Sequence, residues 1–376
     1  MEYTSRNNPP TYVGEGTRQL SLLAKALDKG QVEEKLLHKA LEITTRGWGH
    51  LLIPHDTKSL RWVPDVSNDH SPFEYSVALN QETGEADLRF LIEAQPSGAL
   101  SPATLTQLQT EAVKLSWRLA NEYGSEISWD RFNAIRDLFI PSNPAGSFAM
   151  WYSYALGRDG GEWKVYFNPQ CTPGRSNAIA RTRAAFERLG LAEPWAKVER
   201  SLGENESVVY FSLDLSSSPS IARVKVYISH GQGSSALAIA RKHEAICPNA
   251  NPYEIQRFCG AMSGGKLGPY ERKSLISCFA FTSAEPDQPI GTVHFPVSSY
   301  ASNDHEIQER ISNYINAVRV PDLFKERYRN IINAMQRRQL NEGINIHAWV
   351  SLKQASRNKQ TNAFYLSAGL FGSREL

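Results

Sequence analysis

Cysteine is scarce in this chain, with four residues among 376. None belongs to a CxxC pair, and no histidines stand beside them at zinc-finger spacing, so the sequence predicts neither a metal site nor a disulfide framework. We interpret all four as reduced thiols, which predicts a cytoplasmic protein. They are Cys171, Cys247, Cys259 and Cys278.

Long apolar runs and an excess of one charge are also missing. No stretch approaches the roughly 20 apolar residues that span a bilayer, and the polar start MEYTSRNNPP lacks the core of a signal peptide. We therefore expect no membrane association. The 41 Lys and Arg residues nearly balance 39 Asp and Glu residues, for a net charge of +2. This balance argues against nucleic acid as a partner.

Two common phosphate-binding motifs are absent as well. The chain has neither a DDxxD run, which would hold magnesium, nor a GxxxxGKS/T loop. An anionic ligand would therefore have to be held by individual cationic side chains, without a metal.

What the chain does have is a repeated order of elements. Two stretches with helical spacing are followed by two alternating stretches typical of strands, and this order occurs five times. The predicted helices are residues 17–29, 32–47, 103–123, 128–139, 176–189, 194–202, 234–245, 252–262, 304–318 and 321–339. The predicted strands are residues 72–80, 86–94, 149–156, 162–168, 207–214, 221–229, 274–281, 291–297, 345–353 and 362–370.

Landmark residues in the second strand of each round indicate an internal repeat. They are separated by 75, 61, 69 and 71 residues, and they are Arg89, Lys164, Lys225, His294 and Tyr365.

Ten strands joined as consecutive hairpins can close into an antiparallel barrel, which leaves no exposed edge. We predict an α+β fold of five ααββ units, in which ten strands surround a lumen and about ten helices cover them. Nothing in the composition suggests a linker, so residues 1–376 are predicted to form one domain, with residues 1–14 as a loose arm.

The stretch 221–229, IARVKVYIS, shows how these strands are oriented. Arg223, Lys225 and Tyr227 share one face, and the other face is aliphatic. If helices cover the barrel, the aliphatic face must point outward and the polar face into the lumen.

Five further strands obey the same rule, and Lys164 and Tyr166 repeat the spacing of Lys225 and Tyr227. Solvent exposure would explain one polar face, but the repeated pairing of a cation with a tyrosine favours a shared lumen. A ten-stranded barrel is wide enough to enclose a chamber. The other residues placed inside are Glu74, Ser76, Arg89, Glu93, Asn168, Trp349, Ser351, Lys353, Tyr365 and Ser367.

Four cations would meet in this chamber: Arg89, Lys164, Arg223 and Lys225. Without matching carboxylates they would repel one another at a costly close range. We therefore expect them to surround a polyanion, and a diphosphate fits because arginine can bind two oxygens at once.

Tyr166, Tyr227 and Tyr365 add electron-rich rings to the same faces. Such rings stabilise a carbocation without reacting with it. Beside a bound diphosphate, they predict ionisation of an allylic diphosphate in a site that excludes water. Glu74 is either a salt-bridge partner of the cations or the acceptor of a hydrogen bond from an indole N–H.

Seven segments carry a family resemblance by their order and spacing. They are PFEYSVAL (72–79), LRFLIEA (88–94), DLFIPSNPAG (137–146), WKVYFNP (163–169), ARVKVYISH (222–230), VHFPVSSY (293–300) and FYLSAG (364–369). From about Ser71 to its end, the chain resembles the bacterial, indole-prenylating branch of the dimethylallyltryptophan synthase type of aromatic prenyltransferase.

The resemblance implies an ABBA barrel with the reaction inside it, a prenyl diphosphate as co-substrate and no metal requirement. It places the indole-binding carboxylate at Glu74. It places the diphosphate ligands at Arg89, Lys164, Arg223 and Lys225, and the tyrosine shield at Tyr166, Tyr227, Tyr365 and Tyr300.

Two positions depart from the fungal pattern. His294 stands where fungal members have tyrosine, and Thr292 stands where they have glutamine, which changes one part of the shield and one phosphate contact. A late basic ligand before the last strand is one of three residues, Arg357, Lys353 or Lys359.

We expect an alkyl transferase of secondary metabolism. It would move a dimethylallyl or geranyl group from its diphosphate to an indole ring. The ring would belong to tryptophan or to a compound derived from it, such as an alkaloid. Trp349 would line the aromatic pocket, and Glu74, His294 or water would take the ring proton. The alternatives are a barrel that binds an isoprenoid or anionic lipid without catalysis, and prenylation of a non-indole aromatic. We expect a monomer or a weak homodimer.

Overall fold

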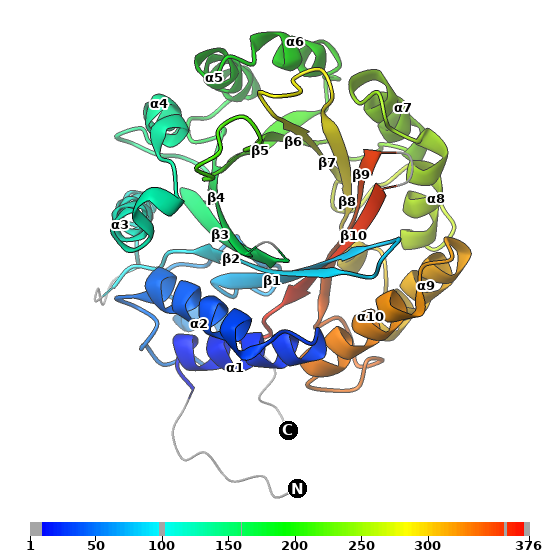
Figure 1. The fold of residues 1–376 in the computed structure, drawn as a ribbon, viewed down its shortest axis with the longest axis horizontal. Helices are drawn as coiled ribbons and strands as arrows, with labels where there is room; N and C mark the ends of the chain where they lie inside the picture. The colour runs from blue at the N-terminus through cyan, green and yellow to red at the C-terminus, as the bar shows by residue number, and fades with distance from the viewer. Residues whose placement is uncertain (1–9, 98–101, 159, 357–358, 372–376) are drawn as a thin grey trace, which may run out of the picture.

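The computed structural model describes residues 10–97, 102–158, 160–356 and 359–371. Within these ranges, ten strands close into one antiparallel barrel in which each strand pairs with its neighbours in sequence and β1 pairs with β10 (Figure 1). The strands are β1 (Phe73–Asn80), β2 (Ala86–Glu93), β3 (Met150–Gly157), β4 (Gly160–Phe167), β5 (Ser207–Asp214), β6 (Val224–Ser229), β7 (Ile276–Phe281), β8 (Ile290–Phe295), β9 (His347–Ser356) and β10 (Lys359–Ser367).

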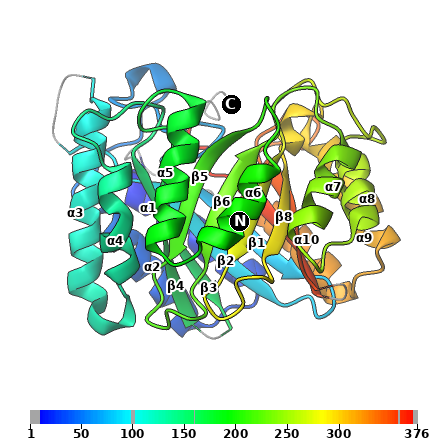
Figure 2. The same cartoon turned by 90° about the horizontal axis from the view of Figure 1, so that it is seen from above.

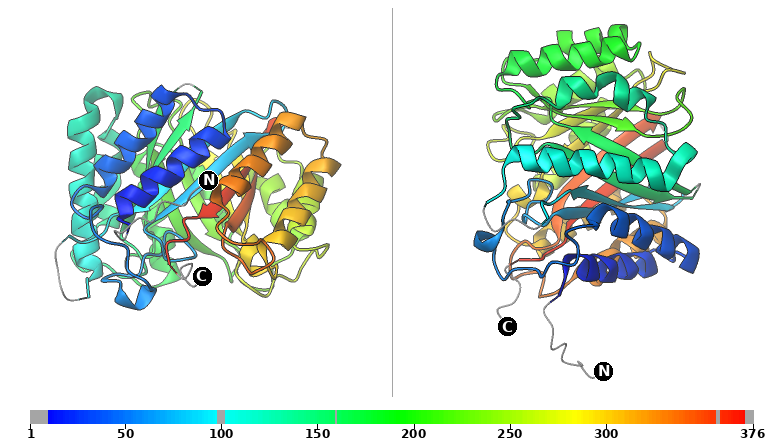
Figure 3. Two further views of the ribbon diagram at one scale, coloured as in Figure 1. Left: turned by 90° about the horizontal axis from the view of Figure 1, so that it is seen from below. Right: turned by 90° about the vertical axis from the view of Figure 1, so that its left-hand side faces the viewer.

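Paired helices form a second ring outside the strands, as views across the barrel show (Figures 2 and 3). None of those in the described ranges is long and apolar enough to cross a lipid bilayer. They are α1 (Tyr12–Ala26), α2 (Gln31–Thr45), α3 (Leu105–Tyr123), α4 (Asp130–Phe139), α5 (Arg175–Arg188), α6 (Ala192–Arg200), α7 (Ala236–Ile246), α8 (Pro252–Met262), α9 (Asp304–Ala317) and α10 (Asp322–Met335). The predicted order of two helices and two strands, five times over, is confirmed.

The main hydrophobic core lies between the two rings. On β6, Val224, Val226 and Ile228 point outward and are almost completely buried, as the alternation predicted. On α10, Phe324 and Tyr328 belong to an apolar stripe at helical spacing that packs toward the barrel. Burying one such side chain contributes about 1.5–3 kcal/mol to stability, so the outward parity of the strands is strongly determined.

The first helix begins earlier than its pattern indicated. The Thr11 side chain accepts a hydrogen bond from Gly14 N and caps the helix, which therefore starts at Tyr12 and not at residue 17. The Tyr12 ring packs edge-on against Trp48, with centroids 5.5 Å apart. Residues 12–14 are thus helical and not part of a loose arm, while residues 1–9 lie outside the described residues.

Two strand limits also differ in ways that affect the lumen. Arg223 lies just before β6, where the chain enters the strand. The last hairpin is tighter than predicted, because β9 continues to Ser356 and β10 already begins at Lys359. Lys353, predicted as the last residue of its strand, therefore lies within β9 and not at its end.

Candidate active site

The lumen contains two adjoining cavities. The first, here called the cationic cavity, is lined by all four predicted cations and by one more, and these are Arg89, Lys164, Arg223, Lys225 and Lys353. The second, here called the aromatic cavity, is lined by residues that include Trp151, Tyr210, Lys273 and Trp349. The two share a layer of side chains, which are Glu74, Leu91, Tyr166, Tyr227, His294 and Tyr365. A charged chamber and an aromatic chamber therefore meet inside one barrel.

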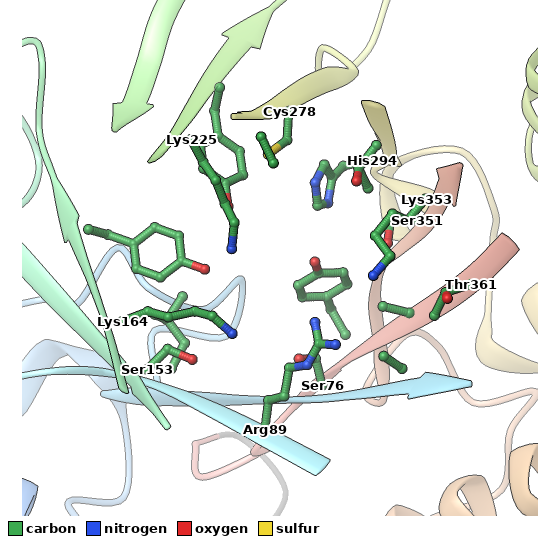
Figure 4. Close-up of a pocket in the computed structure, with 18 of the residues that line it drawn as sticks. Ser76, Arg89, Ser153, Lys164, Lys225, Cys278, His294, Ser351, Lys353 and Thr361 are labelled. Carbon is green, nitrogen blue, oxygen red and sulfur yellow. The ribbon is translucent and has the colours of Figure 1, made fainter. Parts of the chain in front are cut away.

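Strand register brings the cations together from residues far apart in sequence. Lys164 on β4 is directly opposite Asp214 on β5, and Ser212 on β5 is opposite both Tyr166 and Lys225. Figure 4 shows Lys164, Lys225, Arg89 and Lys353 projecting from different strands into a common space. The convergence predicted from alternation is thus present in the structure.

Three carboxylates accompany these cations, which corrects the expectation that the cations have no acidic partners. Glu162 Oε2 lies 2.9 Å from Lys164 Nζ and 2.8 Å from Arg223 Nη2. Asp214 pairs with the Arg223 guanidinium, and its Oδ1 accepts a hydrogen bond from Lys225 Nζ at 3.1 Å. None of these carboxylates lines the cationic cavity, whereas the cations do. The acidic groups therefore relieve repulsion without occupying the space that an anion would fill.

The third carboxylate belongs to Asp87, whose Oδ2 accepts a hydrogen bond from Arg89 Nη2 at 2.9 Å. Arg89 Nε is buried and has no hydrogen-bond partner among the described residues. Lys353 forms no ion pair within that part of the chain, and burial followed by repulsion from Arg89 and Arg223 lowers its pKa to about 8. Both side chains thus retain capacity for an anionic ligand.

Burial and mutual repulsion act together on the lysines. Burial, followed by repulsion from Arg223, lowers the pKa of Lys225 to about 7, although Asp214 opposes the change. The pKa of Lys164 is also lowered, first by burial. A polyanion in the cavity would reverse these shifts, because it stabilises the charged ammonium groups.

A belt of aromatic rings separates the two cavities. It consists of Tyr166, Tyr210, Tyr227, His294 and Tyr365, and is called the ring belt below. The ring of Tyr227 lies 5.9 Å from Tyr166, 5.7 Å from Tyr210 and 5.9 Å from His294. His294 in turn lies 5.6 Å from Tyr365 in an edge-on arrangement. The imidazole thus fills the place in the belt where a tyrosine was missing.

His294 is a weak base in this environment. Burial, followed by the charges of Lys225 and Arg89, lowers its pKa to about 3. The neutral ring therefore adds aromatic surface to the belt without adding a positive charge.

Glu74 lies in the shared layer and lines both cavities. Burial, with a smaller contribution from Asp69, raises the pKa of its carboxyl group to about 8, although Lys273 opposes the change. Lys273 lines the aromatic cavity, with Nζ 2.7 Å from Asn68 Oδ1 and 4.7 Å from the centre of the Trp349 ring. Glu74 therefore stands beside the aromatic pocket, where an indole N–H could reach it.

Glu93 has a different position from the one predicted, because it does not line either cavity. Its carboxylate accepts hydrogen bonds from Trp62 Nε1 at 2.7 Å, Trp151 Nε1 at 2.9 Å and Asp65 N at 3.0 Å. It thereby ties the segment before β1 to the wall of the aromatic cavity, to which Asp65 and Val66 of that segment contribute.

The remaining predicted residues lie in different parts of the structure, and not all of them line a cavity. Trp349 lines the aromatic cavity, as expected. Tyr300 lines neither cavity: its ring packs on Phe295, and its hydroxyl donates to Lys273 O at 3.1 Å. Of the three choices for a late basic ligand, Lys353 faces the lumen, Lys359 is exposed at the start of β10, and Arg357 lies outside the described residues.

Several residues of the site escaped the sequence reading. Tyr210 and Asp214 alternate on β5 with Phe211 and Leu213, so the signal was present, but a bulge between Val208 and Tyr210 interrupts it. Lys273, Asp65 and Asn68 come from irregular segments, where no periodicity indicates direction. In the described ranges, no group of three or more His, Cys, Asp or Glu side chains is arranged to hold a metal.

Solved structures of prenyltransferases have the same closed barrel and resemble this chain closely. A 6-dimethylallyl tryptophan synthase is 25% identical, with 97% of this chain and 98% of that chain covered and a TM-score of 0.84. The 6-dimethylallyltryptophan synthase from Micromonospora olivasterospora, in complex with DMASPP and Trp, is 25% identical over 96% and 98% of the chains, with a TM-score of 0.83. The 5-dimethylallyl tryptophan synthase from Streptomyces coelicolor shares the fold, with 21% identity over 96% of each chain and a TM-score of 0.84.

The sequence model of the tryptophan dimethylallyltransferase family matches residues 18–330, which is most of the chain. This protein therefore belongs to the tryptophan dimethylallyltransferase family.

Proposed function

We propose that this protein transfers a dimethylallyl group from dimethylallyl diphosphate to the indole ring of tryptophan. The observation that carries the proposal is the layered lumen: five cations line one cavity, an aromatic cavity adjoins it, and the ring belt lies between them. A donor with an anionic head and an apolar chain fits this polarity along the barrel, and its reactive carbon would lie at the belt.

In the reaction, the allylic C–O bond of the donor breaks and its electron pair leaves with the diphosphate. Arg89, Lys164, Arg223, Lys225 and Lys353 stabilise the charge that develops on the leaving oxygen. The allylic cation is held against the ring belt, whose electron-rich faces attract it. An indole carbon then attacks the cation, and the ring loses a proton to restore aromaticity.

Glu74 is assigned to the acceptor. As a carboxylate it would accept a hydrogen bond from the indole N–H, which orients the ring and raises its nucleophilicity. Because its pKa is raised to about 8, the carboxylate that forms as the pH rises through that value is a stronger base than an ordinary glutamate, which suits it to accept the ring proton. The low pKa of His294 makes it a poorer candidate for that step.

The acceptor proposed is the free amino acid. Asp65 and Lys273 line the aromatic cavity with opposite charges, and Asp65 Oδ2 is held by a hydrogen bond from Ser147 Oγ at 2.6 Å. A free α-amino acid presents an ammonium group and a carboxylate, which match this pair. A cyclic dipeptide presents neither charge.

Reaction without a metal is part of the proposal, because the cationic side chains supply the charge needed to hold a diphosphate. We also propose a cytoplasmic enzyme, supported by four free, buried thiols, that acts as a monomer or weak homodimer.

The test is product analysis by mass. Purified protein is incubated with tryptophan and dimethylallyl diphosphate in the presence of EDTA, then with geranyl diphosphate and with tryptophan-containing cyclic dipeptides. A dimethylallyl mass gain on tryptophan together with release of diphosphate supports the proposal. Tight diphosphate binding without product on any acceptor would instead indicate a carrier, and product only with added magnesium would contradict the metal-free mechanism.

A further inference from the structure

Asp214 is the most buried of the three carboxylates that accompany the cations. Its side chain is 1% exposed, compared with 36% for Glu162 and 47% for Asp87. It stands at the end of β5, where the chain turns toward β6. The other two can exchange their ion pairs for water, whereas a fully buried carboxylate depends on its protein partners.

Both oxygens of this carboxylate are used to hold cations. Oδ1 accepts a hydrogen bond from Lys225 Nζ at 3.1 Å. Oδ2 accepts one from Arg223 Nε and another from Arg223 N, the latter at 3.2 Å. Lys225 and Arg223 both line the cationic cavity and Asp214 does not, so Asp214 supports these two cations from behind.

The backbone around Asp214 is braced from outside the barrel. Arg131 on α4 donates to Asp214 O and to Ala222 O, each at 2.7 Å, and so bridges the two sides of the β5–β6 turn. Asp214 N donates to Arg223 O at 3.0 Å across that turn. These contacts hold the backbone that carries the Asp214 carboxylate.

Lys225 needs an anionic neighbour more than the arginine does. Its ammonium group is buried, and burial together with Arg223 and Lys164 lowers its pKa, whereas Asp214 and Cys278 act to raise it. The titratable groups that face it are Arg223 beside it on the chain, Asp214 on β5, Lys164 on β4, Cys278 on β7 and His294 on β8. Asp214 is the carboxylate among them, and its pKa is held well below the usual range: burial acts to raise it, but Lys225, Lys164 and Arg223 lower it more strongly.

We propose that Asp214 is a positioning residue for the transfer reaction, which keeps Lys225 charged and directs both Lys225 and Arg223 toward the diphosphate. The inference rests on the proposed function, because it takes the cationic cavity as the diphosphate site. Asp214 thus supports anion binding through Lys225 and Arg223, although its own charge would repel an anion in direct contact with it.

The test is calorimetric titration with inorganic diphosphate of the full-length wild-type protein and of Asp214→Asn, between about pH 5 and 9. Removing the negative charge disfavours the protonated form of Lys225 and lowers its pKa. The ratio of the two dissociation constants should therefore increase with pH, by about tenfold for each unit by which that pKa falls. Taking the ratio cancels the titration of the ligand itself. A ratio that is constant with pH would overturn the proposal, since a merely structural defect would produce that result.

Three further variants complete the test. Asp137→Asn makes the same change in an exposed ion pair with Arg188, and it should bind diphosphate like the wild type. In a Lys225→Met background, Asp214→Asn should cause no additional pH dependence; if it does, Lys225 is not the group that responds. Lys225→Met alone should flatten the pH dependence of diphosphate binding by the wild-type protein. If it does not, Lys225 does not titrate in this range and the proposal is overturned, whether or not Asp214→Asn folds.

The two proposals can fail separately. Absence of any prenylated product from the wild-type protein would contradict the proposed function, while the dependence of diphosphate binding on Asp214 would still be measured. Conversely, an active wild-type enzyme whose variant shows a constant ratio would retain the function and lose the role of Asp214.

Discussion

The two halves of the lumen are built by different means. All five cations of the cationic cavity lie on or next to strands of the barrel, and four of them are held by carboxylates on the same or neighbouring strands. The aromatic cavity adds irregular segments to the strand walls, with Asp65, Val66 and Asn68 before β1 and Lys273 before β7. The half assigned to the donor is therefore part of the repeated scaffold, and the half assigned to the acceptor is completed by loops.

This difference suggests how the two halves can vary. A diphosphate needs charges at set distances, and strand register supplies those distances. An aromatic acceptor needs shape and a few polar contacts, which loops can change without disturbing the barrel. Changes in the first half should thus affect donor binding strongly, and changes in the second half should affect acceptor use more selectively.

The largest effect is expected for Lys225→Ala. The change removes a buried cation from the cationic cavity and leaves Asp214 with Arg223 as its remaining ion-pair partner, so diphosphate binding should weaken by about 2–4 kcal/mol. Steady-state kinetics with varied dimethylallyl diphosphate should show this loss in kcat/KM. Lys197→Ala, which breaks an exposed pair with Asp287, is the matched control. An unchanged kcat/KM for the donor would refute the assignment of the cationic cavity.

Glu74→Gln should have the next largest effect, and on the acceptor. It keeps the size of the side chain and one hydrogen-bond acceptor but loses the charge. The activation free energy that kcat/KM for tryptophan reports should therefore rise by about 1.5–3 kcal/mol. Because the pKa of Glu74 is raised to about 8, the carboxylate forms only as the pH rises through that value. Wild-type kcat/KM for tryptophan should therefore increase between about pH 7 and 9.

The Glu74→Gln variant should lose this rise with pH while it binds diphosphate normally. Glu199→Gln, in an exposed pair with Arg183, is the control. If the variant retained both the rate and the pH dependence, Glu74 would have no role in acceptor activation.

A smaller effect, confined to the aromatic half, is expected for Glu93→Gln. The Glu93 carboxylate now accepts three hydrogen bonds, from Trp62, Trp151 and Asp65 N. The amide of the variant would direct an N–H group at one of these donors. The hydrogen bonding that holds the segment before β1 in place should weaken by about 1–2 kcal/mol, and the KM for tryptophan should increase as a result. Equal weakening of inorganic diphosphate binding would contradict the separation of the two halves.

The smallest effect is expected for Tyr365→Phe in the ring belt. This change keeps the ring that would face the carbocation, so the rate should stay within about threefold of the wild type. Tyr365→Leu removes the ring and about 0.5–2 kcal/mol of cation–π attraction. Chromatography of the products should then show more dimethylallyl alcohol, formed by water, relative to prenylated tryptophan. The same product ratio in both variants would show that the ring does not shield the cation.

Much of the barrel could be predicted from the sequence because alternation is a local property. Outward residues such as Val224 and Val226 must be apolar to pack under the helices, so Lys225 between them has to face the lumen. Lys164 and Tyr365, placed in the lumen by the same alternation, do line the cationic cavity. Alternation placed Glu93 in the chamber as well, where parity alone could not reveal that Trp62 and Trp151 would bind it.

Prediction was weakest where periodicity is broken or absent. The bulge in β5 concealed that Tyr210 faces the lumen. Tyr300 was assigned to the shield by resemblance only, and the turn after β8 carries it onto Phe295 and away from both cavities.

The sequence by itself determined the order of elements, the closed barrel and the direction in which each strand face points, because these follow from local hydrogen bonding and from the need to bury one face. Only the tertiary structure decided which groups meet across strands. Register places Asp214 opposite Lys164 and within hydrogen-bonding distance of Lys225, and folding of the loops places Lys273 and Asp65 in the aromatic cavity. Such contacts depend on distances between residues far apart in the chain, which a one-dimensional pattern does not contain.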